Sequence, residues 1–565
     1  MTVSIRQNNK IKGIHVRNEE IKLAQYADDT NGILTDLDSV QEFFTTIAEF
    51  GRFSGLKINK NKTEAMWLGS FRHCKNKPLG ISWSEKPIRV LGIYISYDEN
   101  EAVKNNFDSR IKEAEMCFNM WNQRNLTCLG RIHLVKTFII SKFIFVSSLI
   151  PTPDSYIKVI DRIVYKFIWG GKKPKLNKNA LSADYSEGGL RAPVFSNMIQ
   201  SSRVMWLKRY LAPSKSSWKL FFEEFTNSLG CIELLLSSNY QLDKLPAKIP
   251  AFYAQVLESW LLVRNKNDTH ANLIWNNSSI LIGGKSVYWK EFLQAGIWFV
   301  QDLYNKNNQL ILFEVWMNMG ISPRYLVKWA GLINCVAKGG KRDSRIDGAI
   351  PMSLCVCKNE KVYNIETVNS ALIYSILMNS RKRVHYNNTL AEQLNCMDTN
   401  IWKESYLLLH SIIPDTKTKV FQYRILHNFL AVNYWLKKWG IKEDDSCALC
   451  NQHPETIPHL FCWCYHSKRF WNDFEKWWLR STGETISINS KIIIFGDRKE
   501  SHIFNFIVIL GKQFIFNCRE NMVLFINFIS FVRTVFNLEE YIARNNGTMP
   551  EFIKRWGSLL DVFDN

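Results

Sequence analysis

The chain is organised around a stretch near its start, Ile21-Lys22-Leu23-Ala24-Gln25-Tyr26-Ala27-Asp28-Asp29-Thr30-Asn31-Gly32-Ile33-Leu34. Two adjacent carboxylates, Asp28 and Asp29, lie between two short apolar arms. This pattern predicts two short buried strands joined by a tight turn. Carboxylates at such a tip can hold Mg²⁺, because that cation prefers oxygen ligands and keeps several waters. A two-metal site for nucleotidyl transfer also needs at least one further carboxylate, and most paired Asp residues are simply solvated.

Three motifs follow one another in the first hundred residues. Tyr26-Ala27-Asp28-Asp29 resembles the catalytic turn of reverse transcriptases. Downstream, Ser54-Gly55-Leu56-Lys57-Ile58-Asn59 with Lys62-Thr63-Glu64 resembles the next palm motif of the non-LTR (LINE-type) retrotransposon enzymes. Arg89-Val90-Leu91-Gly92-Ile93 then resembles their primer-grip hairpin. Three motifs in the order of that family are far more specific than one tetrapeptide.

The resemblance implies a role for each of these residues. Asp28 would coordinate a catalytic Mg²⁺, and Asp29 would support it. Leu91 and Gly92 would hold the end of the primer. Tyr26 would contact nucleic acid beside the catalytic turn.

Lysines are predicted to contact nucleic acid in two segments. Lys57 and Lys62 could hold incoming phosphates, or they could belong to a solvated loop, as most lysines do. The run from Tyr165 to Lys178 carries five lysines, three aromatic residues and no acid. Lysines neutralise phosphates, whereas aromatic rings either stack on bases or pack in a helix core. We expect mostly buried aromatic rings here, with nucleic-acid contacts from Lys172, Lys173 and Lys175.

A helix is expected directly after the Asp turn. Ser39 and Glu42 have the spacing of a capping box, and Gly51 and Gly55 lie where the helix should stop. One apolar face repeats at steps of three and four residues. The residues of this face are Leu37, Val40, Phe44 and Ile47.

A second constellation lies near the C-terminal end of the chain, Cys447-x2-Cys450-x8-His459-x4-Cys464. Three thiolates and an imidazole at close spacing are what a closed tetrahedral zinc site requires, and a full ligand set predicts a structural rather than a catalytic ion. The family pattern places the last ligand four residues beyond the histidine. Cys464 lies five residues beyond His459 and Cys462 lies three beyond it, so neither fits that spacing. We choose Cys464 and keep Cys462 as the alternative.

Composition limits the classes of protein to which the chain can belong. Its 565 residues can form several domains. A 46% hydrophobic content with 20 Trp indicates a folded protein. The net charge of +20 favours a polyanionic partner, and nucleic acid is favoured over a membrane because the basic residues are interspersed with aromatic ones.

No membrane or secretion signal is expected. The apolar runs Phe138–Ile150 and Ile503–Phe516 are interrupted by Lys142 and Lys512, which predicts buried helices. The start of the chain is polar and basic, and the thirteen cysteines are mostly scattered, as is typical of reduced thiols. We therefore expect an intracellular protein of the nucleus and cytoplasm.

The predicted fold is α+β and predominantly helical, in five parts along the chain. The parts are a partial palm with the catalytic turn and primer-grip hairpin (1–104), a thumb-like helical region (105–215), a helical connecting region (216–435), a zinc-binding segment (436–480) and C-terminal helices (481–565).

The resemblance implies an RNA-directed DNA polymerase of a non-LTR retrotransposon. This nucleotidyltransferase would use Mg²⁺ and a structural Zn²⁺, with an RNA template and a DNA primer or target as partners. Element RNA or a companion protein could also bind. No Asp precedes Tyr26 in this chain, so the third carboxylate is missing and we expect a truncated copy that is inactive alone. The alternative is a non-catalytic, zinc-containing nucleic-acid-binding protein derived from such an element.

Overall fold

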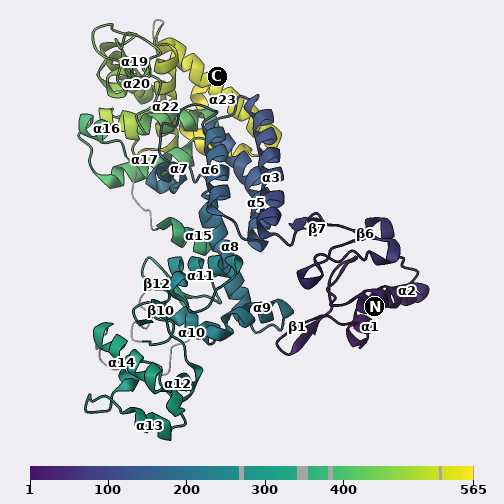
Figure 1. The fold of residues 1–565 in the computed structure, drawn as a ribbon. Coiled ribbons are helices and arrows are strands. Elements are labelled where there is room, and N and C mark those ends of the chain that lie inside the picture. The colour runs from purple at the N-terminus through teal and green to yellow at the C-terminus, as the bar shows by residue number, and fades with distance from the viewer. Residues whose placement is uncertain (266–272, 340–353, 380–385, 521–524, 564–565) are drawn as a thin grey trace. The chain divides into compact units, whose positions relative to one another are not determined.

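A computed structural model describes residues 1–265, 273–339, 354–379, 386–520 and 525–563. Helices dominate these residues, and the strands are short and paired two by two (Figure 1). The predicted α+β, predominantly helical class is therefore confirmed. Two compact units are formed: Met1–Glu113 with Lys142–Lys158 and Phe195–Ser380, and Ala114–Ser141 with Val159–Val194 and Arg381–Asn565.

The first unit contains all the strand pairs of the described residues. Its strands are β1 (Ile14–Val16), β2 (Glu19–Ile21), β3 (Leu23–Tyr26), β4 (Asp29–Gly32), β5 (Glu64–Ala65), β6 (Ser82–Trp83), β7 (Ile88–Val90), β8 (Ile93–Ile95), β9 (Leu281–Ile282), β10 (Lys285–Ser286), β11 (Cys355–Lys358) and β12 (Lys361–Asn364). Consecutive strands pair, and only β5 with β6 is parallel. Its helices are α1 (Thr2–Gln7), α2 (Leu37–Ser54), α8 (Phe195–Leu211), α9 (Ser217–Thr226), α10 (Ile232–Ser237), α11 (Ala251–Val263), α12 (Lys290–Gln294), α13 (Phe313–Asn318), α14 (Leu326–Gly339) and α15 (Ser370–Asn379).

The second unit has helices and connecting segments, and no strand pair, within its described residues. Its helices are α4 (Cys128–Leu134), α7 (Lys178–Ser182), α16 (Asn388–Gln393), α17 (Thr399–Ile412), α18 (Thr416–Leu426), α19 (Asn433–Lys438), α20 (Tyr465–Thr482), α21 (Ser490–Phe495), α22 (His502–Asn517), α23 (Phe525–Asn546), α24 (Met549–Trp556) and α25 (Leu560–Phe563). Three helices carry the chain between the units: α3 (Glu99–Asn122), α5 (Ser141–Leu149) and α6 (Asp154–Ile168).

Helix α2 begins earlier than the capping-box spacing predicts. Asp36 is the N-cap, and its carboxylate accepts a hydrogen bond from the backbone N–H of Ser39 at 2.7 Å. Ser39 is buried inside the helix, so the prediction of a capping box with Glu42 is wrong. Gly55 ends the helix with a φ of 73°, the left-handed conformation that glycine adopts at little cost. Phe43 of α2 is buried in a small apolar cluster with Leu23.

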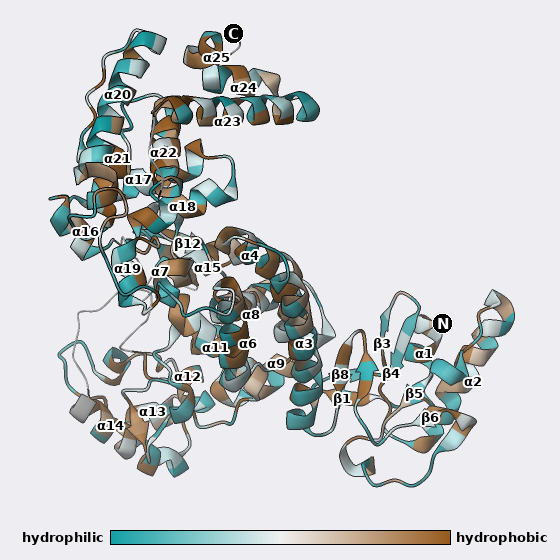
Figure 2. Cartoon of the chain, turned by 90° about the horizontal axis from the view of Figure 1, so that it is seen from above, coloured by the Kyte–Doolittle hydropathy of each residue, from teal (hydrophilic) through white to brown (hydrophobic). Residues whose placement is uncertain are grey.

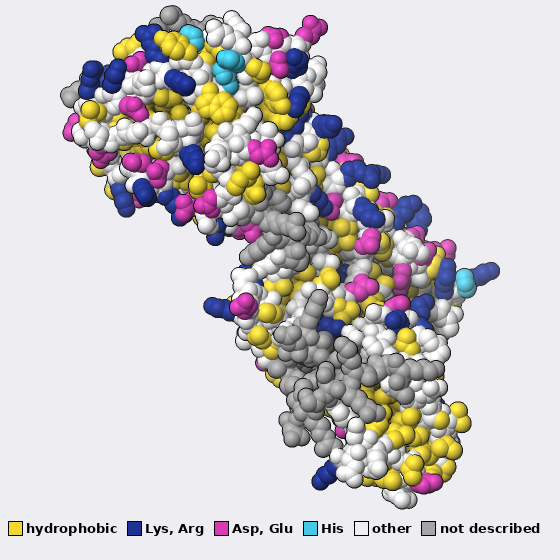
Figure 3. Space-filling model, turned by 90° about the vertical axis from the view of Figure 1, so that its left-hand side faces the viewer, with side chains coloured by type: hydrophobic (Ala, Val, Ile, Leu, Met, Phe, Trp, Pro, Cys, Tyr) yellow, Lys and Arg dark blue, Asp and Glu magenta, His cyan; other side chains and the backbone are white. Residues whose placement is uncertain are grey.

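Two apolar clusters form the core of the rest of the first unit. One gathers α8, α10, α11 and α15 around Trp260, and the other gathers α12, α13 and α14 around Trp275 and Phe292. Hydrophobic side chains are also seen on the surface where α13 and α14 lie, at the lower end of Figure 3. The region of α12, α13 and α14 buries aromatic side chains such as Trp275 and Phe292, whereas several of its aliphatic side chains are exposed. The exposed residues are Leu310, Leu312, Val315, Met319, Leu326 and Val327.

Helix α22 forms the centre of the second unit and is hydrophobic along most of its length (Figure 2). It packs against α17, α18, α21, α23 and α24. Lys512, in the middle of α22, is fully buried and donates a hydrogen bond to Gln422 at 2.7 Å. Burial lowers the pKa of this lysine to about 7. The prediction of a buried helix at Ile503–Phe516 is confirmed.

One run of the described residues, Cys128–Leu149, is long and apolar enough to cross a membrane by length and composition. It consists of α4, a π-helical segment (Val135–Ile140) and α5. Ile132 and Val135, and Phe143 and Val146 further along, are buried within the protein. Phe138, Phe145 and Leu149 are exposed, so the helix predicted at Phe138–Ile150 is buried over only part of its surface.

Asn106 of α3 holds the hairpin formed by β7 and β8. It accepts a hydrogen bond from the N–H of Tyr94 at 3.0 Å and donates one to the Tyr94 carbonyl at 2.7 Å. Asn106 is completely buried. One side chain therefore pairs both main-chain groups of Tyr94, whose register partner in the hairpin is Arg89.

We predict that Asn106→Leu will detach this hairpin. The substitution leaves two main-chain groups of Tyr94 unpaired, which costs about 2–4 kcal/mol of local stability. Hydrogen–deuterium exchange of the peptide that spans β7 and β8 should become faster. Asn105→Ala is the matched control, because Asn105 bonds only within its own helix, and it should leave that exchange unchanged. Equal exchange in the two variants would contradict the prediction.

Candidate functional site

The predicted catalytic turn is a two-residue hairpin connection. Strands β3 and β4 are antiparallel with Tyr26 opposite Asp29, so Ala27 and Asp28 form the turn. Ala27 has a φ of 50°, the left-handed conformation that two-residue hairpin turns use. Asp28 and Asp29 are exposed, and the Tyr26 side chain is 69% exposed. The hairpin thus presents two adjacent carboxylates and one aromatic ring to solvent.

The two carboxylates form an incomplete metal site. Within the described residues, no third His, Cys, Asp or Glu joins Asp28 and Asp29 in a cluster that could hold a metal ion. Two oxygen donors and water can hold Mg²⁺ weakly, but two-metal nucleotidyl transfer needs more ligands. Lys57 and Lys62 are exposed in the loop after α2. Their position leaves both the phosphate-binding role and the solvated loop open.

In the predicted primer-grip hairpin, both residues of the turn have the left-handed backbone conformation. β7 and β8 are antiparallel with Val90 opposite Ile93, and Leu91 and Gly92 have φ values of 48° and 84°. Leu91 is 46% exposed. Arg110 of α3 donates a hydrogen bond to the Gly92 carbonyl at 2.9 Å. The turn is therefore anchored on α3 while the Leu91 side chain remains free to contact a ligand.

The lysine-rich segment follows the end of α6. Phe167 is buried and Trp169 is half-buried, as expected for mostly buried aromatic residues. Lys172 and Lys173 are exposed. The ammonium of Lys175 lies 3.5 Å from the centre of the Trp439 ring, and desolvation lowers the pKa of this lysine. Lys172 and Lys173 are thus presented to solvent, whereas Lys175 is partly held by a cation–π contact.

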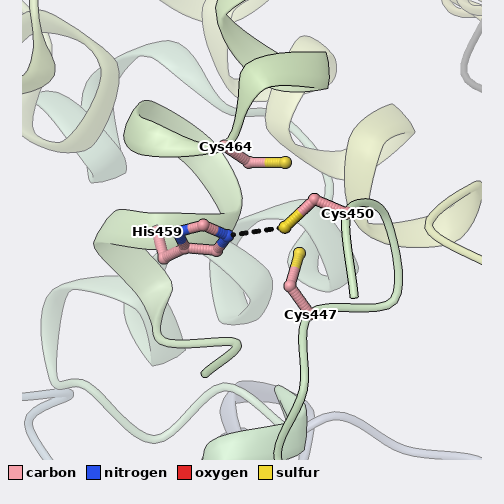
Figure 4. A group of neighbouring side chains, drawn as sticks. All are labelled: Cys447, Cys450, His459 and Cys464. Carbon is pink, nitrogen blue, oxygen red and sulfur yellow. Dashed lines mark hydrogen bonds between the residues drawn. The ribbon is translucent and has the colours of Figure 1, made fainter. Parts of the chain in front are cut away.

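Four predicted zinc ligands converge in the second unit (Figure 4). The sulfur atoms of Cys447, Cys450 and Cys464 and a ring nitrogen of His459 all lie within 4.8 Å of one another. Cys450 Sγ and His459 Nε2 lie 3.4 Å apart, as the dashed line in Figure 4 marks. Bonds of about 2.3 Å to sulfur place tetrahedral ligand atoms about 3.8 Å apart. Small side-chain adjustments therefore suffice to fit this donor set to a tetrahedral zinc ion.

A π-helical turn (His459–Trp463) explains the unusual spacing of the last ligand. The N–H of Cys464 donates to the His459 carbonyl at 2.8 Å, a bond that spans five residues instead of the four of an α-helix. The wider turn takes up one extra residue. Cys464 thus lies with its sulfur within 4.8 Å of the other three ligand atoms.

Cys462, the alternative ligand, lies outside the cluster. It is buried, and its sulfur lies 3.9 Å from the Ser490 carbonyl. Burial raises the pKa of this thiol to about 12. Cys464 instead caps the start of α20, where a hydrogen bond from Cys447 and the backbone N–H groups of residues 466 and 467 lower the pKa of its thiol. The thiolate that a cation needs is therefore favoured at Cys464.

Glu455 holds the loop of the cluster in place. No role was predicted for this residue from the sequence. This fully buried carboxylate accepts hydrogen bonds from the N–H of Ala448 at 2.8 Å and from the N–H of Asn433 at 2.9 Å. The Arg519 guanidinium lies 3.6 Å away and balances its charge. Because Ala448 lies between Cys447 and Cys450, Glu455 fixes the loop that carries two of the four ligands. An acid in a short polar loop is usually solvated, so sequence alone gave no signal for this role.

Comparison with known proteins matches the region of the two hairpins and the region of the zinc ligands to families of reverse transcriptase. Residues 2–95 match the family described as reverse transcriptase (RNA-dependent DNA polymerase). Residues 381–471 match the family described as zinc-binding in reverse transcriptase.

A curated relative supports the same assignment. Over 269 residues the chain is 23% identical to the transposon TX1 uncharacterized 149 kDa protein of Xenopus laevis. The match covers 45% of this chain and 20% of that protein, so the chain spans only a small part of its relative. The two matched regions and this relative agree with the order of motifs along the sequence, and together they support a non-LTR retrotransposon reverse transcriptase.

Proposed function

We propose that this chain supplies the catalytic turn, primer-grip hairpin and zinc-binding lobe of an RNA-directed DNA polymerase, and that alone it binds nucleic acid without extending a primer. The observation that carries the proposal is the exposed hairpin with Asp28 and Asp29 at its tip. Its ligands are an RNA template and a DNA primer or target, with element RNA or a companion protein as further partners. Its place of action is the nucleus and cytoplasm.

In the complete enzyme, Asp28 would bind Mg²⁺ and Asp29 would support that ion. The cation supplies charge stabilisation for transfer of a nucleotide to the primer end. This chain contributes two carboxylates at the tip of an anchored hairpin, and Leu91 and Gly92 would position the primer. A binding protein without polymerase activity is the second candidate, and it is favoured by the absence of a third carboxylate near the turn among the described residues.

The second cofactor of the proposal is a structural Zn²⁺ held by Cys447, Cys450, His459 and Cys464. Three sulfur donors and one nitrogen fill a tetrahedral coordination sphere and leave no position for water. The ion would join the loop that carries the first two ligands to the π-helical turn before α20. Its contribution would be to the folding of the lobe.

We predict that Cys464→Ser will lose bound zinc and Cys462→Ser will keep it. Only Cys464 lies among the other three donors. Zinc content of the purified chains, measured by plasma mass spectrometry, should be about one ion in the wild type and close to none in Cys464→Ser. Thermal unfolding of Cys464→Ser should resemble that of chelator-treated wild type. The reverse pattern, with zinc lost only in Cys462→Ser, would refute this assignment.

We also predict binding of single-stranded nucleic acid that weakens steeply with salt, without primer extension. Lysine contacts to phosphate release counterions, which gives this dependence. Filter retention across a salt series measures binding, and incorporation on an RNA template with Mg²⁺ measures synthesis. The double variant Lys172→Ala/Lys173→Ala should lower the slope of log K against log salt by about 1.4.

Asp28→Asn tests the catalytic turn in the same assay, and Asp38→Asn is the matched control because Asp38 is an exposed acid of α2 outside the turn. Both variants should bind like the wild type and show no synthesis. Extension by the wild type and by Asp38→Asn that disappears in Asp28→Asn would contradict the proposed inactivity and show that another carboxylate completes the site. Absence of nucleic-acid binding would refute the proposal as a whole.

A further inference from the structure

A cavity of about 630 Å³ lies in the first unit. Most of its lining residues lie between Met66 and Glu85, and Tyr97 follows the predicted primer-grip hairpin. Its walls combine aromatic and basic side chains. They include Trp67, Trp83 and Tyr97 together with Arg72, Lys75 and Lys77. A cavity of this size is within the range of about 300–1,000 Å³ that small-molecule ligands occupy. None of these residues belongs to the motifs that identify the family.

The aromatic wall is a stack of rings. Trp67 and Trp83 are stacked with centroids 4.2 Å apart and planes at 22°. Phe71 stacks on Trp67 at 5.6 Å. The Arg72 guanidinium lies 3.7 Å from the centre of the Tyr97 ring. Bases of single-stranded nucleic acids stack on such aromatic rings and on guanidinium planes.

The basic segment is tied to this stack by main-chain hydrogen bonds. The indole N–H of Trp67 donates to the Asn76 carbonyl at 3.0 Å, and that of Trp83 donates to the Pro78 carbonyl at 2.9 Å. These two bonds fix the segment that carries Arg72, His73, Lys75 and Lys77 beside the rings. Because the indole N–H groups are already paired and Trp67 and Trp83 stack on each other, the wall offers a base the ring surfaces that are not in mutual contact.

The charge of the cavity favours an anion. Among the described residues, the only acidic side chain that lines it is Glu85, which forms an ion pair with Lys77 at 3.1 Å. Arg72 and Lys75 are exposed, and Arg72 contacts the Tyr97 ring. Phosphate groups on either side of a stacked base would meet these two side chains.

We propose that this cavity binds one nucleotide of a single-stranded nucleic acid, with the base against the aromatic wall and its phosphates on Arg72 and Lys75. The inference rests on the proposed nucleic-acid binding and gives it a specific site. Stacking recognises any base, so the site would hold a strand without selecting its sequence.

The test compares binding of a short oligothymidylate with that of a fully abasic strand of equal length, both measured by fluorescence anisotropy with the full chain. Tyr97→Ala should weaken oligothymidylate binding about tenfold, because it removes one stacking surface. It should leave abasic-strand binding unchanged. Tyr97→Phe keeps the ring and should bind like the wild type. Phe53→Ala is the aromatic control, because Phe53 is 92% exposed on α2 outside the cavity.

Lys75→Ala tests the cationic wall. Lys104→Ala is the control, because Lys104 is an exposed lysine of α3 outside the cavity. Lys75→Ala should weaken binding of both strands and lower the salt slope by about 0.7, and Lys104→Ala should do neither. Oligouridylate in place of oligothymidylate should give the same order of variants.

Two results would overturn the inference. If Tyr97→Ala leaves oligothymidylate binding unchanged, or weakens the binding of both strands equally, the cavity does not bind a base, although the chain still binds nucleic acid. A wild type that binds no strand would refute the proposed function together with the cavity.

Discussion

The zinc-binding lobe depends on bringing three thiols and one imidazole within reach of one cation. Two short segments do this. The loop of Cys447 and Cys450 is held by the buried Glu455, and the π-helical turn places His459 and Cys464 opposite it. Cys447, His459 and Cys464 are buried, and Cys450 is partly buried. A cation that binds all four would join these two segments and contribute to the folding of the lobe.

In the first unit, two hairpins with very short strands carry the Ala27–Asp28 and Leu91–Gly92 turns. A pair of strands of three or four residues is marginal in water. Here each of the two hairpins is held by a helix or a small core: Asn106 and Arg110 of α3 hold the Leu91–Gly92 turn, and Leu23 of β3 packs with Phe43 of α2. The turn tips remain solvent-exposed because the strands behind them are anchored.

Local sequence predicted the features whose geometry depends on neighbouring residues. The Ala27–Asp28 turn and the Leu91–Gly92 turn are two-residue connections, and both were recognised from short motifs. The choice of N-cap for α2 failed, because Asp36 and Ser39 both have side chains that can cap a helix, and only the observed hydrogen bond identifies Asp36.

Features that join distant segments could not be predicted in the same way. The last cysteine of the zinc cluster was left open between Cys462 and Cys464, because the spacing of a ligand depends on whether the helix makes an α or a π turn. Glu455 and the Trp67–Trp83 stack were missed for the same reason. An acid in a polar loop and two tryptophans sixteen residues apart have no recognisable local pattern.

The sequence by itself determined the resemblance to reverse transcriptases, the helical class, the positions of the Ala27–Asp28 and Leu91–Gly92 turns and the set of candidate zinc ligands. Each of these follows from residue types at short spacing, where chain connectivity limits the possible geometry. The tertiary structure decided which cysteine joins the cluster, which carboxylate holds its loop and which aromatic and basic residues line one cavity. These relations depend on how separate segments pack, and packing is set by the burial and hydrogen bonding of many residues at once.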